Sequence, residues 1–300
     1  MSLRITDLGL ANQRSSWIDA SRSRLAAAEE QIASGRRITR PSDSPADSAN
    51  LLRHQHRLQR VGQFARNNDN AKLWSGAADQ ALQEAANHLG RARTLAIQAG
   101  NDTLGPVENK ALADDIRAIA DGFVAIANTR VQGRAIFAGT ASTADAYDEA
   151  GNYLGDDGVV QRTIDTNETI AVSSTGPEIF GSSNPIDPMN GSLFESLRAL
   201  ADAVEAGDTD TVRQGIAAVD QATARVGQAQ GRVGAVQQQL DAAQSRHGGE
   251  MISTEAHVAT LRDVDIAEAI IRLRSAEASY EATLSATARG LSRSLLDFIR

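Results

Sequence analysis

The segment that decides the fold runs from residue 45 to residue 99 and reads PADSANLLRHQHRLQRVGQFARNNDNAKLWSGAADQALQEAANHLGRARTLAIQA. It opens with helix-start signals: Ser44 supplies a capping hydroxyl, Pro45 suits the first turn and Asp47 places a carboxylate near the N-terminus. Gly100 and Asn101 end the pattern. A helix of this length extends about 80 Å at roughly 1.5 Å per residue. Because an average globular helix has only about 12 residues, the segment predicts a helical rod or bundle.

The composition of the whole chain favours long helices that assemble. Of 300 residues, 41% are hydrophobic but only 4% are aromatic, and much of the apolar content is alanine. Alanine favours helix but buries little surface, so each helix gains less from one partner than a leucine-rich helix would. We therefore expect long contacts or many neighbours.

The charge distribution argues against nucleic acid as a partner. The formal net charge is −8 at pH 7, whereas nucleic-acid binding needs a basic surface. Residues 1–60 contain ten arginines and six acidic residues, but residues 141–210 contain fourteen acidic residues against Arg162 and Arg198. The acidic middle segment is therefore expected to face water.

Other features of the sequence exclude further classes of protein. The absence of cysteine rules out disulfides and thiolate metal sites. No stretch approaches the roughly 18 apolar residues of a membrane span, so no membrane partner is expected. Residues 1–10 carry Arg4 and Asp7 and no long apolar run, and we therefore expect export without a cleaved signal peptide if the protein leaves the cell.

Both chain ends carry narrow apolar stripes with a seven-residue repeat. The N-terminal stripe lies in residues 7–34 and stops at Gly35, and two repeating positions follow Asp265 near the C-terminus. Stripes this thin do not stabilise an isolated helix, so each should order only against a partner. The two ends are expected to run antiparallel and to leave apolar surface for neighbouring subunits. The expected assembly residues are Leu8, Ile18, Leu25, Ile32, Ile266, Ile270, Leu273, Tyr280, Leu284, Leu291, Leu295 and Phe298.

The middle of the chain changes character after a helix expected over residues 106–131. Residues 134–191 are rich in Gly, Asp, Asn, Ser and Thr, which favours a small β-rich insertion. A hairpin with Asp157-Gly158 in its turn is expected there. Ser192 and Glu195 form a capping box that restarts helix. A second long helical tract follows from about Thr209, with an interruption expected at 247–249.

These elements predict a mainly α fold. We expect an elongated antiparallel helical bundle or coiled coil formed by both chain ends, with a small β-rich inserted outer domain. The expected terminal coiled-coil region comprises residues 1–45 and 255–300, and the helical rod comprises 46–133 and 192–254. The outer domain takes residues 134–191.

No group of residues predicts catalysis, a cofactor or a metal site. His54 and His56 lie two apart on a helix and point away from each other, and the other histidines are isolated. Asp156-Asp157 lacks the spacing of a calcium loop. Between the first two helices, a basic loop carries Arg36, Arg37 and Arg40, for which an intersubunit role and simple solvation are equally favoured.

Four separated motifs resemble the flagellin family, and within it the branch found at the hook–filament junction. They are EQIASGRRITRPSD (30–43), RNNDN (66–70), NTRVQGRAIFAGT (128–140) and the terminal tract 284–298. The third motif is the most discriminating, because junction proteins of the family enter their outer domain through a Phe-containing strand and Gly-Thr like this one. The resemblance covers roughly residues 1–140 and 195–300.

The resemblance implies a structural subunit that joins hook to filament and is not an enzyme. Such proteins leave the cell unfolded through the flagellar type III apparatus and assemble as a ring. The implied partners are further copies of the chain, the adjoining hook-associated junction protein, flagellin and an export chaperone at the C-terminal segment. Two alternatives remain open: a filament flagellin, or a cytoplasmic coiled-coil scaffold protein.

Overall fold

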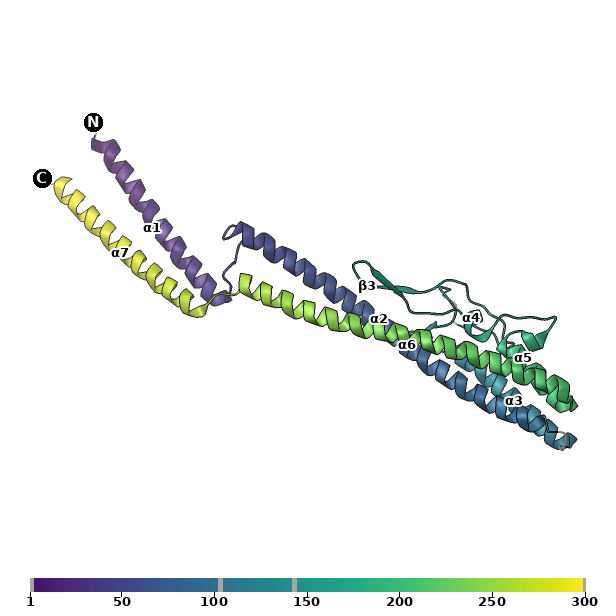
Figure 1. The fold of residues 1–300 in the computed structure, drawn as a ribbon. Helices are drawn as coiled ribbons and strands as arrows, with labels where there is room; N and C mark the ends of the chain where they lie inside the picture. Colours follow the sequence, from purple (N-terminus) through teal and green to yellow (C-terminus); the bar gives the residue numbers. More distant parts are fainter. Residues whose placement is uncertain (1–2, 102–104, 142–144, 299–300) are drawn as a thin grey trace. The chain divides into compact units, whose positions relative to one another are not determined.

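The computed structural model describes residues 3–101, 105–141 and 145–298, without the side chains of residues 3–8, 10–11 and 290–298. Long helices dominate it (Figure 1), which confirms the mainly α fold expected from the sequence. In chain order the elements are α1 (Leu3–Ser34), α2 (Pro45–Ala99), α3 (Pro106–Ala127), β1 (Arg130–Val131), β2 (Arg134–Ala135), β3 (Gln161–Asp165), β4 (Glu168–Ala171), α4 (Gly176–Phe180), the 3-10 helix η1 (Pro188–Asn190), α5 (Leu193–Ala206), α6 (Thr209–Arg262) and α7 (Ile266–Phe298).

The chain divides into two compact units. The terminal unit consists of residues 1–60 and 250–300, and the central unit consists of residues 61–249. Helices α2 and α6 each contribute one segment to the terminal unit and one to the central unit. Both ends of the chain therefore belong to the same unit, and the β segment belongs to the other.

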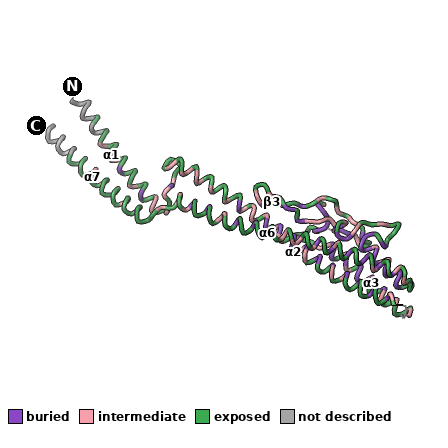
Figure 2. Tube along the Cα trace, viewed as in Figure 1, coloured by how far each residue is buried: buried purple, intermediate pink, exposed green. Residues whose placement is uncertain are grey.

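The core of the central unit is built by α2, α3, α5 and α6 together with the inserted segment. Helices α2 and α6 are antiparallel: the Asn68 amide donates to the Leu240 carbonyl at 3.0 Å, and Arg93 pairs with Asp220 at 2.6 Å. Figure 2 shows buried residues concentrated in this unit. The buried face of α2 repeats at intervals of three and four residues, which is the periodicity of a helix packed along one side. It includes Ala71, Ala78, Leu82, Ala85, Leu89, Ala92 and Ala96.

Helix α5 has the capping box expected from the sequence. The Ser192 hydroxyl accepts from the Glu195 amide at 3.3 Å, and the Glu195 carboxylate accepts from the Ser192 amide at 3.0 Å. The helix ends at Gly207, which has a left-handed conformation with φ 71°. These two local signals position α5 against α3, which it packs along.

Helix α3 ends at Ala127, before the expected boundary near Val131. The Asn128 side chain accepts hydrogen bonds from the backbone N–H groups of Ala146 and Tyr147 at 2.8 and 2.9 Å. These bonds connect the residue after α3 to the inserted segment, and the helix ends there.

The inserted segment contains two antiparallel pairs, β1–β2 and β3–β4. The hairpin expected around Asp157-Gly158 is wrong, because the hairpin forms further on, where β3 and β4 are joined through residues 166–167. The Asp156 carboxylate instead accepts from the Thr140 and Gly158 amides at 2.7 and 2.9 Å. Asp156 therefore closes a loop onto Thr140, and residues 157–158 do not form the turn of a hairpin.

Side chains of α2 hold the inserted segment in place. The Asn67 amide donates to the Thr163 carbonyl at 2.7 Å, and the Asn70 carbonyl oxygen accepts from Arg162 Nε at 2.9 Å. The Arg162 guanidinium also lies 5.9 Å from the ring centre of buried Trp74. The RNNDN motif thus anchors β3 to α2, a role that the sequence alone did not reveal.

Helix α6 continues through residues 247–249 to Arg262, so the expected interruption at the two glycines is wrong. The helix runs on because residues before and after the glycines are buried: His247 stacks on Phe64 with ring centres 6.1 Å apart, and Val258 is buried further along. Burial offsets the roughly 1 kcal/mol helix penalty of a glycine. The chain breaks at residues 263–265 instead.

Candidate assembly interface

The terminal unit is built around the antiparallel pair α1–α7, which pack along each other. Their contact begins at the loop end, where the Val264 amide donates to the Gly35 carbonyl at 3.0 Å and the Arg37 amide donates to the Arg262 carbonyl at 2.7 Å. Asp265 caps α7, since its carboxylate accepts from the Ala267 amide at 2.8 Å. The loop and the α7 cap therefore set the register of the pair.

The seam between α1 and α7 follows one heptad register. Its buried members are small: Ser21 and Ala28 on α1 and Ala269 on α7. The half-buried members expected from the sequence alternate with them, and small residues at such positions allow two helices to approach closely. Those members are Ile18, Leu25, Ile32, Leu273 and Tyr280. The sequence reasoning did not name Ser21, Ala28 or Ala269 among the expected assembly residues.

The second expected register of α7 flanks this seam and is not buried by it. Ile270 and Leu284 are 41% and 40% exposed, and Ile266 is exposed as well. Ile271 on α7 and Trp17 on α1 are further exposed apolar side chains of the terminal unit. We call Ile266, Ile270 and Leu284 the outer stripe. Apolar side chains collected on one helix face are typical of a surface that meets a partner.

The remaining expected assembly residues lie outside the described side chains. They are Leu8, Leu291, Leu295 and Phe298.

A groove also runs between α1 and α7. It has a volume of about 520 Å³ and is lined mainly by small and polar residues, including Ser21, Ala28, Ser275, Ala276 and Ser279. The groove is therefore bounded mostly by short side chains of α1 and α7.

Arg37 connects three segments within the terminal unit. Its guanidinium donates to the Asp47 carboxylate at 3.0 Å and to the Leu261 carbonyl at 2.9 Å. The Arg37 carbonyl accepts from the Gln31 amide at 3.0 Å. The hydrogen bond and charge of Arg37 lower the pKa of Asp47 below its usual value. The Arg37 side chain thus bonds to other residues of its own subunit.

The other two loop arginines are more accessible. Arg40 is exposed and pairs with Glu30 at 3.2 Å. Within the described residues the Arg36 guanidinium makes no hydrogen bond or ion pair, although its backbone forms a bridge with Asp263. Arg36 is therefore the loop cation most available to another molecule.

The turn of this loop is held by Asp43. Its carboxylate accepts from the Arg40 amide at 2.8 Å and from the Thr39 amide at 3.0 Å. The bond from the Arg40 amide, together with those from Thr39, lowers the pKa of Asp43. The loop is therefore ordered by a carboxylate that must stay ionised.

The histidines and acidic residues form no metal site in the parts of the chain that the structure describes. His54 and His257 stack with ring centres 5.6 Å apart, although the sequence reasoning took His257 as isolated. No described helix is both long and apolar enough to cross a bilayer.

Two family comparisons bear on the arrangement of these helices. Residues 5–142 match the bacterial flagellin N-terminal helical region, and residues 216–299 match the bacterial flagellin C-terminal helical region. The two matches include all of α2, α3 and α7 and most of α1 and α6. The chain belongs to the flagellin family. The resemblance drawn from the four sequence motifs is thereby confirmed.

Individual relatives of this flagellin-family chain include flagellar hook-associated protein 3 of Salmonella typhimurium. The two are 28% identical over 232 residues, which is 73% of each chain. Flagellar hook-associated protein 3 of Escherichia coli is 27% identical over 203 residues, covering 66% of this chain and 62% of that protein. A solved structure of a putative flagellar hook-associated protein from Vibrio parahaemolyticus has the same fold, with a TM-score of 0.67 and 19% identity. It covers 74% of this chain and 100% of that one.

Proposed function

We propose that this chain is a structural subunit of the bacterial flagellum that joins the hook to the filament. The observation that carries the proposal is the pairing of both chain ends in one unit whose outer stripe stays exposed. A helix pair that has satisfied its mutual seam and still presents apolar residues is suited to pack against further copies. The likeness to two hook-associated proteins 3 supports the junction over the filament.

The proposed assembly uses three regions of the chain. Residues 1–45 and 255–300 form the assembly arms, 46–133 and 192–254 form the rod, and 134–191 form the outer domain. The proposed partners are other copies in a ring, the adjoining hook-associated junction protein and flagellin. The chain travels unfolded through the flagellar export apparatus without a cleaved signal peptide, and a chaperone covers the apolar C-terminal segment before export.

Coupled folding and assembly is the mechanism that fits the helix stripes. The buried residues of the α1–α7 seam are mostly small, so the pair gains limited burial by itself. Contact with neighbours adds the burial of Ile270 and Leu284. The arms should therefore become fully rigid only inside the assembled flagellum.

Immunogold labelling of intact flagella tests the proposed position. An antibody against residues 141–190 is applied to wild-type flagella and to a strain that lacks the gene. A single labelled band at the hook–filament boundary is the expected result. Label along the whole filament would assign the chain as a filament flagellin, and label only inside cells would assign it as a cytoplasmic scaffold.

A further inference from the structure

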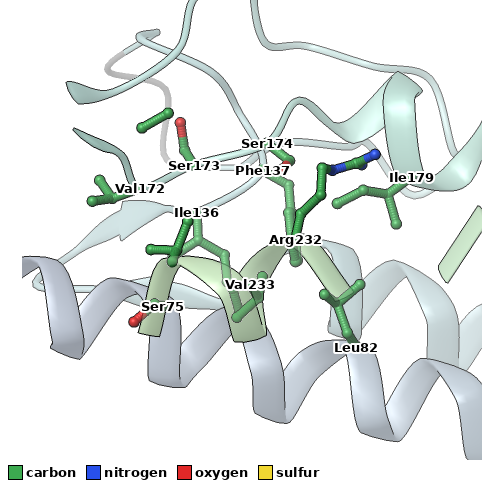
Figure 3. Close-up of a pocket in the computed structure, with 13 residues that line it drawn as sticks. Ser75, Leu82, Ile136, Phe137, Val172, Ser173, Ser174, Ile179, Arg232 and Val233 are labelled. Carbon is green, nitrogen blue, oxygen red and sulfur yellow. The ribbon is translucent and has the colours of Figure 1, made fainter. Parts of the chain in front are cut away.

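The central unit contains an apolar cavity between the inserted segment and the long helices. Its volume is about 120 Å³. Figure 3 shows Ile136, Phe137 and Ile179 of the inserted segment, with Leu82 of α2 and Val233 of α6, around this space. A cavity of about 150 Å³ lined by such residues accommodates benzene. The present cavity is therefore suited to an aliphatic side chain of about four carbons.

The cavity interrupts the buried seam of α6. Ala229 and Leu240 on this seam are fully buried. Val233 and Val236 occupy the intervening seam positions, line the cavity and are only partly buried. The folded subunit thus leaves two core-type side chains incompletely covered at one place.

The edge of the cavity is polar on one side. Arg232 pairs with Glu178 at 3.0 Å, and both side chains are close to half exposed. This pairing uses only one guanidinium nitrogen, so further N–H donors remain. The half-buried Ser174 hydroxyl also has no hydrogen-bond partner in the described part of the chain. An apolar group with a neighbouring carboxylate would match this lining.

Such a group is present on the surface of the same chain. Ile186 is 95% exposed, and it is held between Pro185 and Asp187, with Pro188 next. The Asp187 carboxylate accepts from the side-chain amide of Asn190 at 2.8 Å and pairs with no cation in the described residues. The two prolines restrict the backbone of this loop. Ile186 and Asp187 therefore form a stiff apolar projection with a negative charge beside it.

We propose that Ile186 of one copy inserts into the cavity of the next copy, with Asp187 approaching Arg232. Ile186 is exposed in the subunit, so it does not fill the cavity of its own copy. A projection and a cavity at different places on one surface make a head-to-tail contact, which generates a ring when its rotation closes. The contact rests on the proposed self-assembly and adds a specific link outside the α1–α7 arms.

The absence of native cysteine allows a direct test by disulfide cross-linking. Flagella are isolated from strains that carry Ile186→Cys with Ser174→Cys, or either substitution alone. An added oxidant forms the bond only when the Cβ atoms come within about 4.5 Å. We expect multimers of this chain with the paired substitutions and none with either single one, and mass spectrometry should place the link between positions 186 and 174.

The outcomes separate this contact from the proposed function. Multimers linked between these positions support the contact. Their absence from flagella that still label at the junction overturns the contact and leaves the proposed function in place. A link from position 186 to a different flagellar protein also overturns it. Absence of the chain from flagella would overturn the proposed function and the contact together.

A matched pair of substitutions measures the strength of the contact. Ile186→Ser should weaken association of copies by about tenfold or more, because an isoleucine side chain loses its burial. Val107→Ser is the control, since Val107 is 79% exposed on α3 and belongs to no part of the proposed contact. Equal junction occupancy for the two variants under competition with wild-type chain would contradict the proposal.

Discussion

Single residues decide how the inserted segment closes. Gly139 lies in the IFAGT part of the third family motif and has φ 71°. A Cβ atom there would lie 2.2 Å from the Asp156 carbonyl oxygen, far inside any tolerated contact. Gly133 also has positive φ, at 81°, but nothing lies within 4 Å of its would-be Cβ. Both positions have a positive φ, but only Gly139 lacks room for a Cβ atom.

Gly139→Ala should therefore destabilise the central unit much more than Gly133→Ala. The latter should cost about 1 kcal/mol from backbone strain alone. The former adds a clash with backbone, and we expect a total loss of about 3 kcal/mol or more. Urea unfolding of the two variants checks this, and equal midpoints would contradict the placement of Gly139 against Asp156.

The pH response of the loop after α1 depends on Asp43. Its pKa is lowered in the folded loop, so the stability that it contributes is complete above its unfolded pKa of about 4 and is lost as pH falls through the folded value. Acid should release the Thr39 and Arg40 amides. Amide NMR shifts of these residues should titrate below about pH 4, and Asp43→Asn should abolish the titration. Unchanged titration in that variant would assign the effect to another carboxylate.

At the scale of elements, nearby residues set where a helix begins, but contacts with distant residues set whether it continues. The Ser44-Pro45 start signal predicted where α2 begins and the Ser192–Glu195 capping box predicted where α5 begins, because each uses side chains within one turn of the helix. The continuation of α6 through Gly248 and Gly249 depended on His247 and Val258, which are buried by residues distant in sequence. The length and packing of these helices therefore depend on tertiary contacts.

Ser192→Ala tests the local contribution at α5. It removes the hydroxyl that accepts from the Glu195 amide, and a lost N-cap costs about 1 kcal/mol. Ser182→Ala is the control, because Ser182 is exposed and has no hydrogen bond within the described residues. Thermal unfolding should show a lower midpoint for the first variant and an unchanged one for the second. A shift of equal size in both would argue against the capping box.

At the scale of the whole molecule, the terminal helices and the acid-rich middle segment belong to different units. Both termini contribute to the terminal unit, whereas the acid-rich segment from residue 141 to residue 210 belongs to the central unit. The outer stripe of α7 is therefore available without unfolding the central core. Substitutions on it should affect assembly and spare the folded subunit.

Ile270→Ser combined with Leu284→Ser tests this separation. Ile270 is 41% exposed and Leu284 is 40% exposed in the subunit, so burying the remaining surface of each against a neighbour is worth about 1 kcal/mol. We expect loss of the chain from flagella and loss of motility, with an unchanged circular dichroism spectrum of the purified protein. Glu277→Ser is the control on the same face of α7 and should assemble normally. Normal junction occupancy of the double variant would contradict an assembly role for the outer stripe.

The sequence by itself determined the family, the mainly α class, the helix starts and the inserted segment, because these depend on local motifs, caps and composition. The tertiary structure decided which α7 register pairs with α1. Sequence periodicity proposes one register through Leu273 and Tyr280 and another through Ile270 and Leu284. In the structure the first is half-buried beside the small residues Ala269 and Ala276, which let the helices approach closely, and the second stays exposed. It also decided where the hairpin forms and that α6 crosses two glycines. In each case side chains far apart in sequence supplied the burial or hydrogen bonds that local preference does not contain.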